Sequence, residues 1–426
     1  MTITDIKIRG LFHLYNYNIS FSGDSLVSVI TGPNGYGKTT ILTMLDHLAH
    51  ARLYYFYMLP FDSIHVGLSD GSAIDIVQEQ INSDEVSHDD NKVSQDLAVR
   101  FVWVIDDVES ASFHLTPKLI RETYRKIAYR LPHEHRPGLD IRSSEFAKVV
   151  MGHAVFYEIL ARSQGQDQFL LRLNSLSIVF IPANRIYKNE DEGEESVSPL
   201  KKASTELQEI LKHVQYDYYY TSQQSDSEFM ETLLRSQENF EEEEYNKRSQ
   251  AISDFMNGLA EFGFMGKPRL QPYDVENKRI LSTYLVELER KLQVYRPIMS
   301  KLTLFSDMLK NKSFADKAIL FSPNFGIRAR LNTGENVDLD LLSSGEKNEI
   351  MLLYRFIFTV PDNSTLLLDE PENSLHVVWQ RMLIEDILRI APAKNLQVII
   401  ATHSSRIVTR AKKYTSDLYY LNNQHE

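Results

Sequence analysis

Residues 32–39, Gly-Pro-Asn-Gly-Tyr-Gly-Lys-Thr, have the types and spacing that wrap a chain of phosphates. Glycines allow a tight turn that points successive backbone N–H groups at an anion, and a following helix N-terminus adds partial positive charge. In such a loop Lys38 reaches the β- and γ-phosphates and the Thr39 hydroxyl holds Mg²⁺. The sequence therefore predicts an ATP site with the nucleotide-binding residues Gly32, Asn34, Gly35, Gly37, Lys38, Thr39 and Thr40.

Two adjacent carboxylates, Asp369 and Glu370, follow the apolar residues 365–368. Because an unpaired charge is expensive to bury, carboxylates at the end of a buried strand indicate a function. Asp369 is expected to hold Mg²⁺, directly or through water, and Glu370 to orient and deprotonate an attacking water. A second apolar strand, expected at residues 397–401, ends just before His403.

The elements that must position these residues follow from the hydrophobic pattern. Residues 26–31 are apolar and β-branched enough for a buried strand, and apolar residues recur at helical spacing between Ile41 and Leu48. Strand, glycine-rich loop and helix is the context that the phosphate loop requires. Other expected elements are two strands within residues 1–21, a hairpin at 61–77 turning at Asp70-Gly71, a loop at 82–96, strands at 98–105 and 176–182, and helices from 117 and over 144–164.

Residues 342–346, Leu-Ser-Ser-Gly-Glu, precede a helix expected at 347–359. A serine and a glycine at a helix N-terminus suit an anion. In this order along the chain, the segment resembles the signature motif of ABC-type ATPases, and residues 365–371 resemble their Walker B motif. The resemblance implies an α/β fold, an ABC-type P-loop ATPase head with an inserted helical arm.

The same resemblance implies roles for further residues. The signature residues Ser343, Gly345 and Glu346 of one subunit would close over the γ-phosphate bound to another subunit's P-loop. His403 matches the switch histidine that contacts the γ-phosphate, so Glu370 and His403 are the expected catalytic pair. Residues 372–376 occupy the place of the loop that communicates across such a dimer. No glutamine is convincingly placed as the Mg²⁺-contacting one; Gln78 and Gln80 are weak matches.

Composition excludes several classes of protein. The 426 residues include no cysteine, so disulfides and thiolate metal sites are ruled out. No apolar run approaches the ~18 residues of a membrane span, and the N-terminus lacks the regions of a signal peptide, so a cytoplasmic protein is expected. The net charge of −12 argues against a surface that coats nucleic acid.

Acidity is concentrated in one segment. Residues 188–254 hold 17 acidic and 7 basic residues, whereas the rest of the chain has a net charge of −2. Helical composition, broken between Gly258 and Pro272, predicts an arm that leaves the head and returns, without a long coiled coil. The expected domains are 1–187, the N-terminal half of the head with a helical region at about 117–164; 188–315, the acidic helical arm; and 316–426, the C-terminal half of the head.

Three surface features stay open. Residues 118–148 carry 8 basic and 4 acidic side chains, and a solvated helix face is the simpler interpretation. The alternative is a docking surface for nucleic acid or an acidic protein. Its contacts would be Arg121, Arg125, Lys126, Arg130 and Arg136.

Arg185, past the strand at 176–182, is expected to form a surface salt bridge rather than reach a phosphate. The run 241–244 indicates a solvated acidic face or a mount for a basic partner, and the tyrosines at 216 and 218–220 either pack in an interface or bind a partner.

The distance in sequence between the phosphate loop and the signature motif indicates which group of ABC-type ATPases the chain resembles. Lys38 and Ser343 lie about 300 residues apart, much farther than in a transporter cassette, as in heads of the Rad50, structural-maintenance-of-chromosomes and RecF group. The phosphate loop, Leu-Ser-Ser-Gly-Glu and Asp-Glu-Pro-Glu-Asn-Ser-Leu-His resemble more closely the OLD-like ATPases of bacterial antiphage systems. OLD nucleases continue into a Toprim domain, and only 23 residues follow His403, so the nuclease is expected on another polypeptide.

This resemblance implies partners. In two-gene systems the effector is Toprim-like in PARIS, favoured by the Asn-Gly-Tyr-Gly-Lys-Thr-Thr loop, or an HNH nuclease in Septu. ATP and Mg²⁺, self-association in ATP-sandwich dimers and a higher homo-oligomer such as a hexamer, a separate effector and a phage-encoded trigger are expected. The alternatives are a DNA-repair or chromosome ATPase that binds DNA directly and a scaffold that does not hydrolyse ATP.

Overall fold

The computed structural model describes residues 1–423 except 22–25, 83–94, 129–139, 152–153, 164–167, 184–197, 268, 313, 315, 374 and 376. The chain forms two compact units. The first unit comprises Met1–Arg185, Val360–Asn373 and Gln380–Glu426, and the second comprises Ile186–Thr359 and Ser374–Trp379. Each unit therefore contains segments that are distant in sequence.

A five-stranded parallel sheet organises the first unit, in the order β14-β3-β13-β12-β8. Its strands are β3 (Val27–Thr31), β8 (Ile178–Ile181), β12 (Thr365–Asp369), β13 (Gln397–Ala401) and β14 (Thr415–Asp417). All residues of β12 and β13 are buried, as in parallel sheets covered on both faces. Because β3, β13 and β12 are neighbours, their carboxyl ends bring together the three segments predicted to carry chemistry.

An antiparallel six-stranded sheet, in the order β2-β1-β4-β5-β6-β7, belongs to the same unit. Its strands are β1 (Ile3–Leu11), β2 (Tyr15–Ser20), β4 (Ser63–Leu68), β5 (Ala73–Asn82), β6 (Gln95–Ile105) and β7 (Val108–Leu115). The predicted hairpin turning at Asp70-Gly71 is present. Strand β7, which the hydrophobic pattern did not predict, follows a tight turn at Asp106-Asp107 with φ of 50° and 60°. Left-handed aspartates are typical of such hairpin turns. Most of the predicted loop at 82–96 lies outside the described residues.

Most helices of the first unit pack against these sheets in a shared apolar core. The helices of this unit are α1 (Lys38–Ala49), α2 (Tyr54–Met58), α3 (Pro117–Ala128), α4 (Ser144–Met151), α5 (Ala154–Ser163), α6 (Gln168–Leu173), α13 (Ser405–Arg410), α14 (Leu418–Asn423) and a 3₁₀ turn, η5 (Lys412–Tyr414). Helix α12 (Val377–Lys394) has its first turn in the second unit and the rest in the first. Ile41, Leu45 and Leu48 of α1 are buried, which confirms the helical face predicted for them. The single helix predicted over 144–164 is described as α4 and α5, with 152–153 and 164 outside the described residues.

Long helices build most of the second unit. They are α7 (Pro199–Arg235), α8 (Glu242–Glu261), α9 (Lys278–Leu292) and α10 (Arg296–Lys310), with η2 (Gln293–Tyr295) between the last two. The predicted break falls between α8 and α9. Ser198 caps α7 by accepting a hydrogen bond from the Lys201 N–H, and Pro199 follows it, as is common at a helix start.

A three-stranded antiparallel sheet follows the arm in the second unit, in the order β11-β10-β9. The strands are β9 (Lys317–Ser322), β10 (Gly326–Leu331) and β11 (Asn336–Val337), followed by η3 (Leu339–Leu341), α11 (Ser344–Tyr354) and a π-helix, η4 (Arg355–Thr359). Residues 316–359, assigned to the head in the sequence analysis, thus lie in the unit that holds the arm. The division at 187 and 315 stays a prediction. Among the described residues, no helix combines the length and apolarity needed to cross a membrane.

Asp46, near the C-terminal end of α1, is buried beside two histidines and an arginine. Burial alone would raise the pKa of Asp46, but hydrogen bonds with His47 and His50 and the charges of His50 and Arg52 bring that pKa below its usual range. The Asp46 hydrogen bond raises the pKa of His50 above 6.5. Protonated His50 therefore stabilises the fold below pH 6.5, and this contribution is lost as pH rises through the raised pKa.

We expect His50→Gln to remove that pH dependence. The His50 side chain is 46% exposed, so solvent screening limits the effect to about 1 kcal/mol or less. Melting temperatures measured at pH 6 and pH 8 should differ less in this variant than in the unaltered chain. A matched control is His213→Gln, because His213 pairs with Asp217 on an exposed surface. An unchanged pH dependence in His50→Gln would contradict the assignment.

Candidate functional site

The glycine-rich loop joins β3 to α1, and its backbone geometry requires glycine. Gly37 is the N-cap of α1 with φ of 83°, and a Cβ there would lie 3.0 Å from Cδ2 of Leu11. The Tyr17 hydroxyl donates a hydrogen bond to the Tyr36 carbonyl at 2.8 Å, which fixes the loop from outside. Helix α1 has no side-chain cap and no acidic residue in its first turn. Its first N–H groups and partial positive charge are therefore available to an anion.

Lys38 is buried at the start of α1, and its ammonium donates to the carbonyls of Gly32 and Pro33 at 2.8 and 3.1 Å. Burial lowers the pKa of Lys38. The carboxylates that oppose this shift are those of Glu370, Asp369, Glu372 and Asp417. The lysine is thus the cation at the centre of an acidic site.

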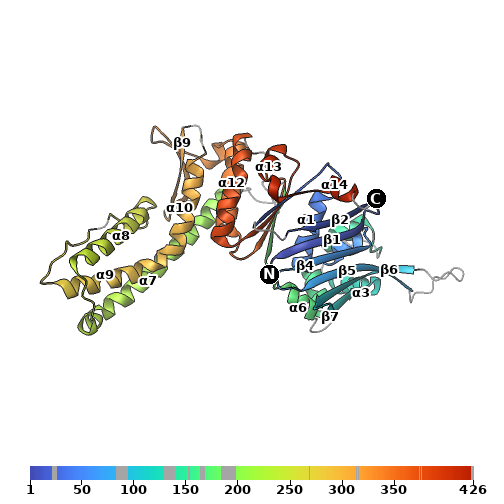
Figure 1. The fold of residues 1–426 in the computed structure, drawn as a ribbon, viewed down its shortest axis with the longest axis horizontal. Coiled ribbons are helices and arrows are strands. Elements are labelled where there is room, and N and C mark those ends of the chain that lie inside the picture. The colour runs from blue at the N-terminus through green and yellow to red at the C-terminus, as the bar shows by residue number, and fades with distance from the viewer. Residues whose placement is uncertain are drawn as a thin grey trace. The chain divides into compact units, whose positions relative to one another are not determined.

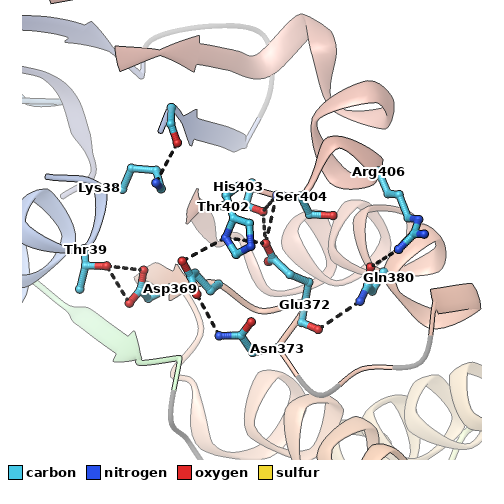
Figure 2. A network of polar contacts seen from close by, with 12 residues as sticks. Lys38, Thr39, Asp369, Glu372, Asn373, Gln380, Thr402, His403, Ser404 and Arg406 are labelled. Carbon is cyan, nitrogen blue, oxygen red and sulfur yellow. Dashed lines mark hydrogen bonds and ion pairs between the residues drawn. The ribbon is translucent and has the colours of Figure 1, made fainter. Parts of the chain in front are cut away.

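Thr39 and Asp369, 330 residues apart in sequence, meet at this site (Figure 2). The Thr39 hydroxyl lies 3.0 and 3.1 Å from the two carboxylate oxygens of Asp369. Burial raises the pKa of Asp369, and the neighbouring Glu370 and Glu372 add to the increase, against the Thr39 hydrogen bond. Hydroxyl and carboxylate oxygens are the ligands that Mg²⁺ prefers, and the excess of carboxylates over cations suits a divalent ion. The donor set therefore fits the predicted metal.

Glu370 follows β12 in a left-handed conformation, with φ of 41°, that is strained for a residue with a side chain. Its backbone N–H donates to the carbonyl of Ala401 at 2.8 Å, which holds the strained turn against the end of β13. One carboxylate oxygen accepts from the Asn373 amide at 2.9 Å, and the other lies 3.1 Å from Nδ1 of His403. The structure thus brings together the two residues predicted as catalytic.

Glu372 has a role that was not predicted from the sequence. Its buried carboxylate accepts hydrogen bonds from the Thr402 hydroxyl and, at 3.2 Å, from the Ser404 N–H. These are the two neighbours of His403, so Glu372 fixes the loop that presents the histidine, as Figure 2 shows. The sequence signal for this role is a third carboxylate within four residues of the end of β12.

An outer pair of side chains continues the network. The Gln380 amide donates to the Glu372 carbonyl at 3.4 Å, and Arg406 donates to the Gln380 oxygen at 3.2 Å (Figure 2). These contacts tie the segment after Glu370 to α12 and α13.

The signature residues lie in the second unit, at the start of α11. The Ser343 hydroxyl accepts from the Glu346 N–H at 3.2 Å, and the Glu346 carboxylate accepts from the Ser343 N–H at 2.8 Å, which forms a capping box. The other Glu346 oxygen lies 2.8 Å from the Lys317 ammonium. Burial would raise the pKa of Glu346, but the hydrogen bonds with Lys317 and Ser343 lower it. Glu346 therefore holds this turn within its own chain, while Ser343 is exposed and Gly345 is half-buried.

The remaining predicted residues are spread over the surface or lie outside the described part. Arg121 is half-buried on α3, whereas Arg125 and Lys126 are exposed. Arg130, Arg136, Arg185, Ser374 and His376 lie outside the described residues. Gln78 donates to the carbonyls of Phe56 and Leu59 at 3.2 and 2.7 Å, so its amide is engaged in the fold, and Gln80 is exposed.

Solved structures with similarity to the chain include heads of structural-maintenance-of-chromosomes proteins. An Smc head domain with an extended coiled coil, bound to the C-terminal domain of ScpA and derived from Pyrococcus furiosus, is 14% identical, with 96% of this chain and 91% of that chain covered and a TM-score of 0.38. An SMC head domain from Thermotoga maritima is 12% identical, with 96% and 92% covered and a TM-score of 0.31. At TM-scores below 0.5, these similarities do not by themselves establish a shared fold.

No curated protein matches the sequence. A family model does: the model AAA_15, described as an AAA ATPase domain, matches residues 1–408. Together with the parallel sheet and the phosphate loop between β3 and α1, this match confirms the predicted α/β class, a P-loop ATPase head with an inserted helical arm. The chain belongs to the AAA_15 family of AAA ATPase domains.

Proposed function

We propose that this chain binds and hydrolyses ATP at sites that two copies of it complete. The observation that carries the proposal is the position of Glu370. It is held between Asn373 and His403, and the preceding residue is the Asp369 that contacts Thr39 of the phosphate loop. A base beside a metal-binding pair is the arrangement that phosphoryl transfer to water requires.

Each residue of the first unit has a role in this proposal. Gly32, Asn34, Gly35, Gly37 and Thr40 shape the cradle, Lys38 contacts the β- and γ-phosphates, and Thr39 with Asp369 holds Mg²⁺. Bound there, Mg²⁺ would neutralise the charge on the phosphates. Glu370 accepts a proton from the attacking water as the water oxygen bonds to the γ-phosphorus and the bond to ADP breaks. His403, placed by Glu372, orients Glu370 and contacts the γ-phosphate.

The signature turn supplies the other half of the site. Ser343 is exposed at the N-cap of α11, and Gly345 lies in the first turn, where partial positive charge favours an anion. By resemblance to ABC-type ATPases, this turn closes over the γ-phosphate bound to the other copy. Glu346 then acts by holding Ser343. ATP binding is thereby coupled to pairing of two chains.

Lys38→Ala tests the nucleotide site. Loss of a charge-assisted hydrogen bond costs about 1.5–3 kcal/mol, so we expect ATP to bind roughly 10- to 150-fold more weakly. Titration calorimetry with ATP and Mg²⁺ measures the change. Lys412→Ala, which removes an exposed lysine of the same unit, should leave the affinity as it was. If Lys38→Ala binds ATP as tightly as the control, the phosphate-loop assignment is wrong.

We further propose that the ATPase is the scaffold and sensor subunit of a bacterial antiphage system that holds a separate nuclease until infection is sensed. The support is resemblance to the OLD-like group at the phosphate loop, the signature and residues 369–376. A PARIS-type system with a Toprim-like effector is favoured over a Septu-type system with an HNH nuclease. A phage-encoded product is the proposed trigger.

A DNA-repair ATPase of the RecF or Rad50 kind is the second candidate, because Arg125 and Lys126 are exposed on α3. Mass spectrometry of what co-purifies with the Glu370→Gln chain from its native operon, in the presence of ATP, separates the two. A stoichiometric Toprim-like or HNH nuclease supports the defence proposal and identifies the system. Recovery of the chain with DNA alone would favour the repair function.

A further inference from the structure

Large apolar side chains gather on the outward face of α7. Tyr216, Tyr219, Tyr220, Met230 and Leu234 are between 61% and 73% exposed. At 3.6 residues per turn these positions fall within about 100° of one another, so they form one face, here named the α7 stripe. The opposite face of α7 packs against the rest of the second unit, where α9 runs alongside it (Figure 1).

Within the α7 stripe the intervening exposed residues are neutral. Gln223 and Ser227 occupy its middle, and the Gln223 amide donates to the Tyr219 hydroxyl at 2.7 Å. Charges at its border are paired: Glu231 with Arg235 and Asp217 with His213 along the helix, and Asp226 with Lys291 of α9. Exposed apolar patches of this kind are often functional on monomeric proteins, so the α7 stripe is a candidate interaction site.

Spacing along the α7 stripe is self-complementary. When two copies of α7 lie antiparallel and cross at the level of residue 225, Tyr216 of each copy faces Leu234 of the other. In the same register Tyr220 faces Met230, and Gln223 faces Ser227. An isologous two-fold interface needs this property, since each patch must be the complement of itself.

Charge favours the same orientation. In the antiparallel register the border carboxylates Asp217 and Glu231 face Leu233 and Tyr219 of the other copy. A parallel pair would place each of these carboxylates beside the same carboxylate of the other copy. Because like charges across an interface are unfavourable, the antiparallel arrangement is the one that fits.

We propose that the α7 stripe is a second self-association surface, occupied by the α7 stripe of another copy in antiparallel orientation. It needs no nucleotide and so goes beyond the ATP-dependent pairing proposed above. Residues 216–234 span about 27 Å, and a strip about 10 Å wide presents roughly 300 Å² per copy. A standard interface buries about 800 Å² per partner, so this contact is weak alone. When ATP-dependent pairing already holds two copies together, the α7 stripes of paired copies meet at a high effective concentration. The weak contact can then link pairs into larger assemblies.

Cysteine cross-linking tests the register, because the chain has no native cysteine. Gln223→Cys and Ser227→Cys chains, one of them tagged, are mixed without nucleotide in a Lys38→Ala background under mild oxidation. The mixed disulfide should form at least about five times faster than either same-position disulfide, since position 223 faces 227. Equal rates, or cross-links between identical positions only, would overturn the proposal.

A charge placed on the α7 stripe provides a second test. Tyr220→Glu introduces two charges into each two-fold interface, so we expect the nucleotide-free association constant from analytical ultracentrifugation to fall at least about tenfold. Asn246→Glu adds the same charge to an exposed position of α8 and should not change it. Circular dichroism checks that both variants keep their helices. Association of Tyr220→Glu at the unaltered strength contradicts the proposal.

Experiments can refute the composite ATP site and the α7 stripe independently of each other. ATP-dependent pairing should persist in Tyr220→Glu, and cross-linking of 223 to 227 should persist in Lys38→Ala. Loss of ATP-dependent pairing in the unaltered chain with cross-linking retained would refute the composite ATP site and leave the α7 stripe standing.

Discussion

Glu370→Gln is expected to lower ATP turnover by about 10²- to 10⁴-fold while leaving ATP binding intact. The amide has the shape of the carboxylate and can still accept a hydrogen bond from Asn373, which now lies 2.9 Å from the Glu370 carboxylate. It cannot accept a proton from water, so hydrolysis slows while the nucleotide remains bound. Phosphate release at saturating ATP measures the loss.

Trapped ATP should also hold two copies together. We expect light scattering to show an ATP-dependent paired state of Glu370→Gln that outlasts that of the unaltered chain. Glu385→Gln is the matched control, because Glu385 is an exposed carboxylate of the same unit that pairs with Arg410. Normal turnover in Glu370→Gln would remove Glu370 from the role of base.

The parts of the site that could be predicted are those with a local signal. Residues 397–401 are an unbroken apolar run and form β13, and the glycines at 35 and 37 have the positive φ that their turn requires. The hydrophobic period of α1 likewise matches its buried face. In each case the residues that determine the structure are neighbours in sequence, so the pattern is sufficient.

Other features depend on contacts between distant segments and leave at most a weak pattern. Glu372 is marked in the sequence only as a third carboxylate near the end of β12, and its burial arises because β13 brings Thr402 and Ser404 to it. Glu346 matches a motif residue expected to face another subunit, whereas its carboxylate is held by Lys317 of its own chain. The α7 stripe could be predicted in part. Its tyrosines are evident in the sequence, but only the structure shows that they are exposed together on one face of α7.

Lys312→Met is expected to destabilise the second unit by about 3–5 kcal/mol. Lys312 and Glu349 form an ion pair in which neither side chain is exposed to solvent. Removing the lysine takes away the counter-ion that lies against the buried Glu349 carboxylate, and this cost far exceeds that of a surface pair. Nothing in the sequence distinguishes these residues from a surface lysine and glutamate.

Trp379 offers a reporter for that unit, since its ring packs 5.4 Å from the ring of Phe314, two residues from Lys312. The chain has two tryptophans, so in a Trp103→Phe background urea unfolding followed by fluorescence reports the second unit alone. Lys310→Met removes an exposed lysine nearby and should shift the transition little. The double variant Lys312→Met with Glu349→Met should recover most of the stability, because two apolar side chains replace the whole pair.

The same variants separate stability from assembly. Glu349 lies on α11 one turn after Glu346, which caps the signature turn. Loosening α11 in Lys312→Met should therefore weaken ATP-dependent pairing, while ATP binding at the phosphate loop of the first unit stays unchanged. If the double variant regains stability and pairing together, the ion pair acts by anchoring α11. If Lys312→Met unfolds at the same urea concentration as Lys310→Met, the buried pair does not stabilise this unit.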